Sequence, residues 1–164
     1  MFMRLELSTH SEEETVLLGS AIGKTLRDGD LVLLLGQLGS GKTRLAKGLV
    51  SAATGVPEDD VVSPTFTLMN SFEGPIAVHH ADLYRIAPNQ VEGIGLEEAL
   101  DGGVLVAEWA EDIRDFTDDP LEIIVEQGDS ENLRHIVLGF REDGSWGSRL
   151  EKIALRHGPE RSEA

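Results

Sequence analysis

Residues 36–43 carry the residue types that bind a polyphosphate. They read G-Q-L-G-S-G-K-T and fit the phosphate-binding pattern G-x-x-x-x-G-K-[ST]. Glycines at Gly36, Gly39 and Gly41 allow backbone N–H groups to approach phosphate oxygens, because no side chain keeps the backbone away. Lys42 supplies a positive charge for the β- and γ-phosphates, and the Thr43 hydroxyl is placed to bind a magnesium ion that bridges them. These residues predict a nucleoside triphosphate site.

The flanks of this loop have the pattern that such a site requires. Residues 31–35 form a continuous apolar run, as expected for a parallel strand that is buried on both faces. Behind the loop, Leu45, Leu49 and Ala53 recur at helical spacing. The N-terminus of that helix would add its partial positive charge at the phosphates. A glycine-rich turn with a solvated lysine is the alternative, and the order strand, loop, helix argues against it.

Two further apolar runs end in carboxylates. Residues 76–82 end at Asp82, and residues 104–109 end at Glu108 and Trp109. A carboxylate at a strand end can approach the metal of a phosphate site. The spacing does not decide which of Asp82 and Glu108 ligates magnesium and which acts through water, and either acid alone also fits a solvated strand end. Trp109 fits either the core or a contact with the nucleotide.

Two other segments carry polar groups that fit either a structural or a functional role. Residues 63–66, S-P-T-F, form a hydroxyl-rich loop around a proline, which also fits an ordinary turn. His79 and His80 are adjacent, but no third histidine or cysteine is placed to complete a transition-metal site. A structural or hydrogen-bonding role for His80 is therefore the expectation.

The composition limits the class of protein. The 164 residues suit one domain, expected over 1–157 and followed by a disordered polar tail at 158–164. No apolar run approaches the roughly 20 residues of a membrane span, and the N-terminus lacks the apolar core of a signal peptide, so the cytoplasm is expected. The net charge of −16, from 30 acidic and 14 basic residues, opposes direct binding to a nucleic-acid backbone.

The remaining periodicity predicts an α/β fold. Ser11 and Glu14 form a capping box before a helix whose Leu18, Ile22 and Leu26 share one face. The other elements expected are an edge strand at 3–7, a hairpin of strands at 66–72 and 76–82, a helix at 96–100, a short helix or turn at 111–116, antiparallel strands at 121–127 and 133–140, and a last helix at 146–156.

Four segments occur in a defined order: the phosphate loop, residues 63–66, residues 80–85 (H-A-D-L-Y-R) and residues 108–109 (E-W). Together they resemble the TsaE family, the small bacterial ATPase of the tRNA threonylcarbamoyladenosine system, over nearly the whole chain up to residue 140. The resemblance implies a P-loop NTPase-like three-layer sandwich with a mixed central sheet flanked by helices. It also implies that the chain works with TsaB and TsaD, meets tRNA only indirectly, and has no membrane or DNA partner.

The resemblance also implies roles for particular residues. Asp82 and Glu108 would be the metal and water positions, residues 63–66 a switch-like loop over the nucleotide, and Lys42 a catalytic residue together with both acids. Arg85 is the nearest candidate for an arginine finger. The residues expected to bind ATP or ADP are Gly36, Gly39, Ser40, Gly41, Lys42, Thr43, Arg44, Thr65 and Trp109, with Thr43, Glu108 and Asp82 at the Mg²⁺ ion.

Two other functions are compatible with a phosphate loop. A small-molecule kinase of this fold would usually need an arginine-bearing lid, and the sequence has no arginine-rich insert. A nucleotide-dependent binding switch would need no essential hydrolysis. The acidic segment 58–60 and the C-terminal region depart from the family pattern, which leaves the partner-binding surface open.

Overall fold

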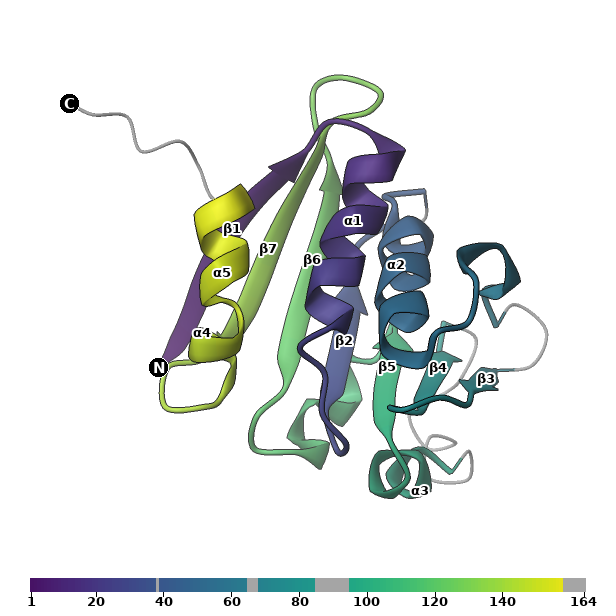
Figure 1. Cartoon of the computed structure of the whole chain (residues 1–164). Helices are drawn as coiled ribbons and strands as arrows, with labels where there is room; N and C mark the ends of the chain where they lie inside the picture. Colours follow the sequence, from purple (N-terminus) through teal and green to yellow (C-terminus); the bar gives the residue numbers. More distant parts are fainter. Residues whose placement is uncertain (38, 65–67, 85–94, 158–164) are drawn as a thin grey trace.

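The computed structural model describes residues 1–37, 39–64, 68–84 and 95–157 (Figure 1). In these ranges the chain forms one seven-stranded mixed sheet of order β1-β7-β6-β2-β5-β4-β3. The strands are β1 Phe2–Thr9, β2 Leu31–Leu35, β3 Met69–Phe72, β4 Val78–Asp82, β5 Val104–Glu108, β6 Leu121–Gln127 and β7 Arg134–Arg141. The helices are α1 Glu12–Gly23, α2 Lys42–Thr54, α3 Leu96–Asp101, α4 Trp146–Arg149 and α5 Glu151–His157, with 3₁₀ turns at Glu58–Asp60 and Glu111–Phe116.

Strand β2 lies inside the sheet and has buried residues on both faces. It pairs in parallel with β5 and β6, and β5 pairs in parallel with β4. Val32 and Leu34 pack under α1 and α2, whereas Leu31 and Leu33 pack against α3 and the 3₁₀ turn at Glu111–Phe116. Helices therefore cover both faces of the sheet, and the predicted three-layer sandwich with a mixed sheet is confirmed (Figure 1).

The hairpin of β3 and β4 and the antiparallel pair of β6 and β7 are both confirmed. Strand β1 is at the edge of the sheet, as predicted, and pairs only with β7 among the described strands. The beginning of the predicted strand 66–72, the polar stretch at 85–94 and the tail at 158–164 lie outside the described residues. Within the described ranges, no helix has the length and apolar character needed to cross a bilayer.

Three local predictions need correction. The Ser11 hydroxyl caps α1 by accepting a hydrogen bond from Glu14 N (3.1 Å), but Glu14 reaches back to the N–H of His10 (2.6 Å) instead of that of Ser11. Helix α1 ends at Gly23, so Leu26 packs into the core from beyond the helix. The reason is local, because the N–H groups of Thr25 and Leu26 donate to carbonyls three residues back, Ile22 O (2.9 Å) and Gly23 O (3.3 Å), instead of four.

The predicted C-terminal helix at 146–156 is two helices. Helix α4 ends at Arg149, and α5 begins at Glu151. At the break, the Arg149 guanidinium donates from Nη1 and Nη2 to the two carboxylate oxygens of Asp30 (2.6 and 3.0 Å). Both side chains are buried, and the arginine also stacks on Trp146. This pair ties the C-terminal helices to the turn that leads into β2.

Helices α1 and α2 pack with their backbones in direct contact. A Cβ added at Gly48 of α2 would lie 2.0 Å from the carbonyl oxygen of Val16, and one added at Gly19 of α1 would lie 2.1 Å from that of Leu45. Because neither backbone has room to move past the other, the two glycines set the distance between the helices. The packing therefore fixes the position of α2, whose N-terminus carries the phosphate loop.

Replacing Gly48 by alanine should destabilise the protein, although alanine is the better helix former by about 1 kcal/mol. The added methyl group would overpack the contact with Val16, at an expected cost of about 1–3 kcal/mol in the free energy of unfolding. Urea denaturation measures this change. Ser51→Ala, in the same helix, is the matched control and should shift stability by less than about 0.5 kcal/mol. A Gly48→Ala variant as stable as the natural chain would contradict the close packing.

Candidate functional site

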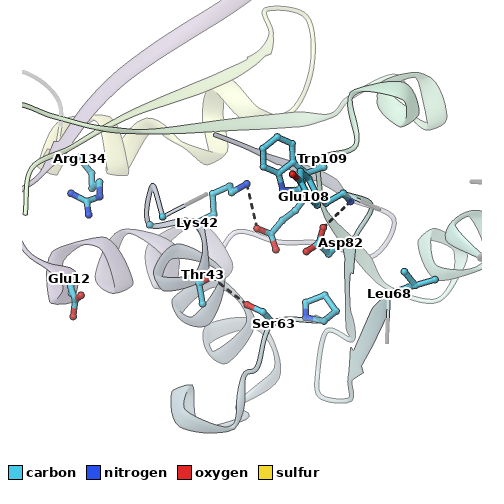
Figure 2. Close-up of a pocket in the computed structure, with 13 residues that line it drawn as sticks. Glu12, Lys42, Thr43, Ser63, Leu68, Asp82, Glu108, Trp109 and Arg134 are labelled. Atoms are coloured by element: carbon cyan, nitrogen blue, oxygen red, sulfur yellow. Dashed lines mark hydrogen bonds and ion pairs between the residues drawn. The ribbon is translucent and has the colours of Figure 1, made fainter. Parts of the chain in front are cut away.

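A cavity of about 450 Å³ lies at the carboxyl ends of the parallel strands (Figure 2). Its walls come from segments far apart in the sequence: the phosphate loop and α2, the segment before β3, the ends of β4 and β5, and the start of β7. The lining residues are Glu12, Gly39, Gly41, Lys42, Thr43, Ser63, Pro64, Leu68, Asp82, Tyr84, Glu108, Trp109 and Arg134.

The phosphate loop has the backbone that its glycines predict. Gly36 has φ 139° and Gly41 has φ 109°, a region that favours glycine, and a Cβ at Gly36 would also lie 2.3 Å from Val125 O. Gly41 is the N-cap of α2 and provides no side-chain hydrogen bond to the first turn. The Ser40 hydroxyl is buried and has no hydrogen-bond partner among the described residues. A bound phosphate would satisfy the uncapped N–H groups of the first turn of α2.

Lys42 and Glu108 are buried and face each other across the cavity. Lys42 Nζ donates to the Gly36 carbonyl (2.7 Å) and lies 3.9 Å from Glu108 Oε1. The other carboxylate oxygen, Glu108 Oε2, lies 2.9 Å from His80 Nε2, and His80 is also buried. The hydrogen-bonding role predicted for His80 is confirmed. Because each oxygen of Glu108 has its own neighbour, the orientation of the carboxylate is fixed.

Asp82 lies beside Glu108, since the two residues are register partners at the ends of β4 and β5. Asp82 Oδ1 accepts a hydrogen bond from Tyr84 N (3.0 Å). Across the cavity, the hydroxyl oxygens of Thr43 and Ser63 are 3.4 Å apart. Figure 2 shows these carboxylates and hydroxyls around the same space.

These oxygen donors suit magnesium better than a transition metal. Mg²⁺ is usually held by one or two carboxylates together with substrate phosphates and water. Among the described residues, no group of three or more His, Asp or Glu side chains could hold a metal ion by itself. Thr43, Asp82 and Glu108 therefore fit a Mg²⁺ ion that arrives with a phosphate ligand.

Trp109 is held in an uncommon backbone conformation. Its φ is 57°, and the only other non-glycine residue with positive φ in the described ranges is Leu68 (52°), which lines the same cavity. The half-buried indole lies over Lys42, with Nζ 4.1 Å from the ring centroid, and its centroid is 5.0 Å from that of Tyr84. Such strain in a bulky residue is often found at functional sites. Of the two positions that the sequence left open, the structure places Trp109 in the wall of the cavity.

The structure brings together most of the residues that the sequence singled out. Gly39, Gly41, Lys42, Thr43, Asp82, Glu108 and Trp109 line one cavity. Gly36 and Ser40 line a neighbouring cavity of about 340 Å³ with residues of β6. The Arg44 side chain is half-exposed and pairs with Glu12 of the cavity wall (3.4 Å), but Arg44 itself does not line the cavity. Thr65, Phe66 and Arg85 lie outside the described residues.

Two charged residues of the cavity belong to no sequence motif that predicts a nucleotide site. Arg134, at the start of β7, and Glu12, in the first turn of α1, enter it from elements that carry none of the motifs. Arg134 is one of 14 basic residues, and only the pairing of β7 with β6 brings it to the phosphate loop. A pattern search along the chain could not have found either residue.

Comparison with known proteins assigns a family to this arrangement. The family model described as "Threonylcarbamoyl adenosine biosynthesis protein TsaE" matches residues 9–136. Two proteins named "tRNA threonylcarbamoyladenosine biosynthesis protein TsaE" are similar. The one from Rickettsia conorii is 33% identical over 146 residues, which cover 87% of this chain and 83% of that protein. The one from Streptomyces coelicolor is 37% identical over 131 residues, which cover 74% and 86%.

A solved structure has the same architecture. The crystal structure of YdiB from Bacillus subtilis superposes with a TM-score of 0.74 at 25% identity. The match covers 95% of this chain and 97% of that one, so it includes both flanks of the sheet as well as the phosphate loop.

Trp109 should report on ligand binding. Its indole lies over Lys42, so a phosphate that draws the ammonium group away should change the tryptophan emission when Mg²⁺ and ADP are added. Trp146 is buried and donates to Asp119 O, which should make its emission insensitive. A Trp109→Phe variant should therefore lose most of the response. An equal response from Trp109→Phe, with ADP binding verified by calorimetry, would contradict this assignment.

Proposed function

The chain belongs to the TsaE family of threonylcarbamoyl adenosine biosynthesis proteins, and we propose that it supports this tRNA modification by hydrolysing ATP. The modification falls on the adenosine next to the anticodon, and the chain acts with TsaB and TsaD. One observation supports the hydrolytic role above the others: the carboxylates of Asp82 and Glu108 are neighbours in register, opposite Lys42 and Thr43 in one cavity.

The chain binds the phosphates through its backbone and Lys42. The N–H groups of the first turn of α2 receive no side-chain cap from Gly41, so they are available to the β- and γ-phosphates. Lys42 Nζ, held at the Gly36 carbonyl 2.7 Å away, is positioned to follow the charge that develops during phosphoryl transfer. A bound Mg²⁺ ion would neutralise charge on the same phosphates, with Thr43 as one protein ligand.

The carboxylates of Asp82 and Glu108 have the two remaining roles, at the metal ion and at the attacking water. One would bind the metal ion, and the other would orient the attacking water. His80 supports Glu108 in either role, because its hydrogen bond to Oε2 leaves Oε1 facing Lys42 and the cavity. A fixed carboxylate needs no reorientation when the γ-phosphoryl group begins to leave, which is how preorganised groups lower a barrier.

Glu108→Gln and Asp82→Asn should each lower the release of phosphate from ATP by about a hundredfold or more, while ADP still binds. The variant that lost the metal ligand should also need more Mg²⁺ to reach its maximal rate, whereas the one that lost the water-orienting group should not. Phosphate release at several Mg²⁺ concentrations separates the roles. Asp101→Asn, an exposed acid at the end of α3, controls for the loss of one charge. Full activity in either site variant would refute the hydrolytic assignment.

The charge of the chain favours indirect contact with tRNA. A net charge of −16 repels phosphate backbones, so the RNA is held by the partners, TsaB and TsaD. Next to the nucleotide cavity the chain exposes three large apolar residues, Val62, Leu68 and Tyr84, which a partner could cover. The segment that includes Ser63 joins this surface to the phosphate site, since its hydroxyl lies 3.4 Å from that of Thr43.

The purified chain should bind tRNA negligibly and hydrolyse ATP slowly, and TsaB with TsaD should raise its turnover. Binding to these partners should weaken as salt rises, because an acidic surface is attracted to basic ones, and it should change with ATP. Titration against tRNA, and then against the partner complex with and without ATP, measures these effects. Tight tRNA binding by the chain alone, or partner binding indifferent to both salt and ATP, would rule out the proposal.

A further inference from the structure

Arg134 lies against the phosphate loop although it belongs to the far strand β7. Its Nε would be 3.3 Å and its Cδ 3.7 Å from a Cβ at Gly41, so the absence of a side chain there lets the arginine pack on the loop backbone. The guanidinium is half-buried and lines the nucleotide cavity. Its Nη1 donates to the carbonyls of Glu131 (2.6 Å) and Leu133 (3.0 Å), which fixes the plane of the group.

The positive charge of Arg134 lies beside other positive groups of the fold. The N-terminus of α2 carries a partial positive charge, and Lys42 already lies there, so a second cation beside Gly41 is repelled by both. Among the residues that the structure describes, Arg134 donates to carbonyls of its own hairpin and not to a carboxylate. A ligand in the cavity would compensate for this cost, which favours a binding role.

The two ends of the cavity differ in chemistry, and this determines which part of a nucleotide meets Arg134. Lys42, Thr43, Asp82 and Glu108 define the end where the γ-phosphate is transferred. Figure 2 shows Arg134 on the opposite side of Lys42 from both carboxylates. A nucleotide whose phosphates follow the loop must therefore direct its ribose and base toward Arg134.

We propose that Arg134 is a nucleoside-binding residue, whose guanidinium plane stacks against the base of the nucleotide. This rests on the proposed ATP site and adds to it the residue that holds the end remote from the chemistry. Arginine suits the task because its planar group stacks face to face on an aromatic ring, whereas a lysine ammonium places only a point charge over the ring. It is not an arginine finger, since it lies on the wrong side of Lys42 for the γ-phosphate (Figure 2).

Calorimetry on the full chain with two probes, Mg²⁺ and ADP or inorganic tripolyphosphate, tests this proposal. Arg134→Lys keeps the charge and removes the planar group, so its affinity for ADP should fall roughly three- to thirtyfold while its affinity for tripolyphosphate changes less than about twofold. Arg134→Ala should lose ADP affinity at least as strongly. Loss of an arginine finger would instead lower the turnover at saturating ATP by about a thousandfold or more, and such a loss would overturn the proposal.

Arg4→Ala, on the exposed edge strand β1, removes one positive charge far from the cavity and should leave both affinities unchanged. Thermal unfolding of each variant checks that the fold is retained. Equal affinity of Arg134→Lys and the natural chain for ADP would overturn the proposal, and so would a loss for tripolyphosphate as large as that for ADP. A natural chain that bound no ADP would contradict the proposed ATP site itself. If the natural chain and the Arg134 variants all bound ADP equally well, only the proposed role of Arg134 would be contradicted.

Discussion

The parallel pairing of β2, β5 and β4 is the constraint on which the site depends. Carboxyl ends of parallel strands meet at one edge of a sheet, so the loop after β2 lies beside the last residues of β5 and β4. Leu34 is the register partner of Glu108, and Glu108 that of Asp82. A shift of one residue in either pairing would turn a carboxylate to the other face of the sheet, away from Lys42.

Packing below the loop is as restrictive as pairing within the sheet. The close contact of α1 with α2 at Gly19 and Gly48 fixes the position of α2 relative to α1. The buried ion pair of Asp30 and Arg149 holds the turn that precedes β2. The phosphate loop is therefore anchored at both ends. Such support offsets part of the conformational entropy that a glycine-rich segment loses when it becomes ordered.

Positive groups gather at the phosphate loop although the chain as a whole is acidic. A protein with 30 acidic and 14 basic residues gathers Lys42, Arg134, uncapped N–H groups and the N-terminus of α2 at one cavity. Three carboxylates, those of Glu12, Asp82 and Glu108, line the same cavity, and Glu108 is paired with Lys42 and His80. The positive groups lie at the phosphate loop, where they favour an anion, while the acidic surface disfavours nucleic acid.

The sequence alone determined the phosphate loop, its strand and helix, and the two strand-end carboxylates, because each depends on residues that are neighbours in the chain or recur at a fixed period. Only the tertiary structure decided what depends on pairing and packing between distant segments. The register brings Asp82 beside Glu108, burial joins His80 to Glu108, and β7 carries Arg134 to Gly41. The break between α4 and α5 also depends on a distant segment, because Arg149 at the break bonds the carboxylate of Asp30. The helical periodicity of residues 146–156 does not reveal that contact.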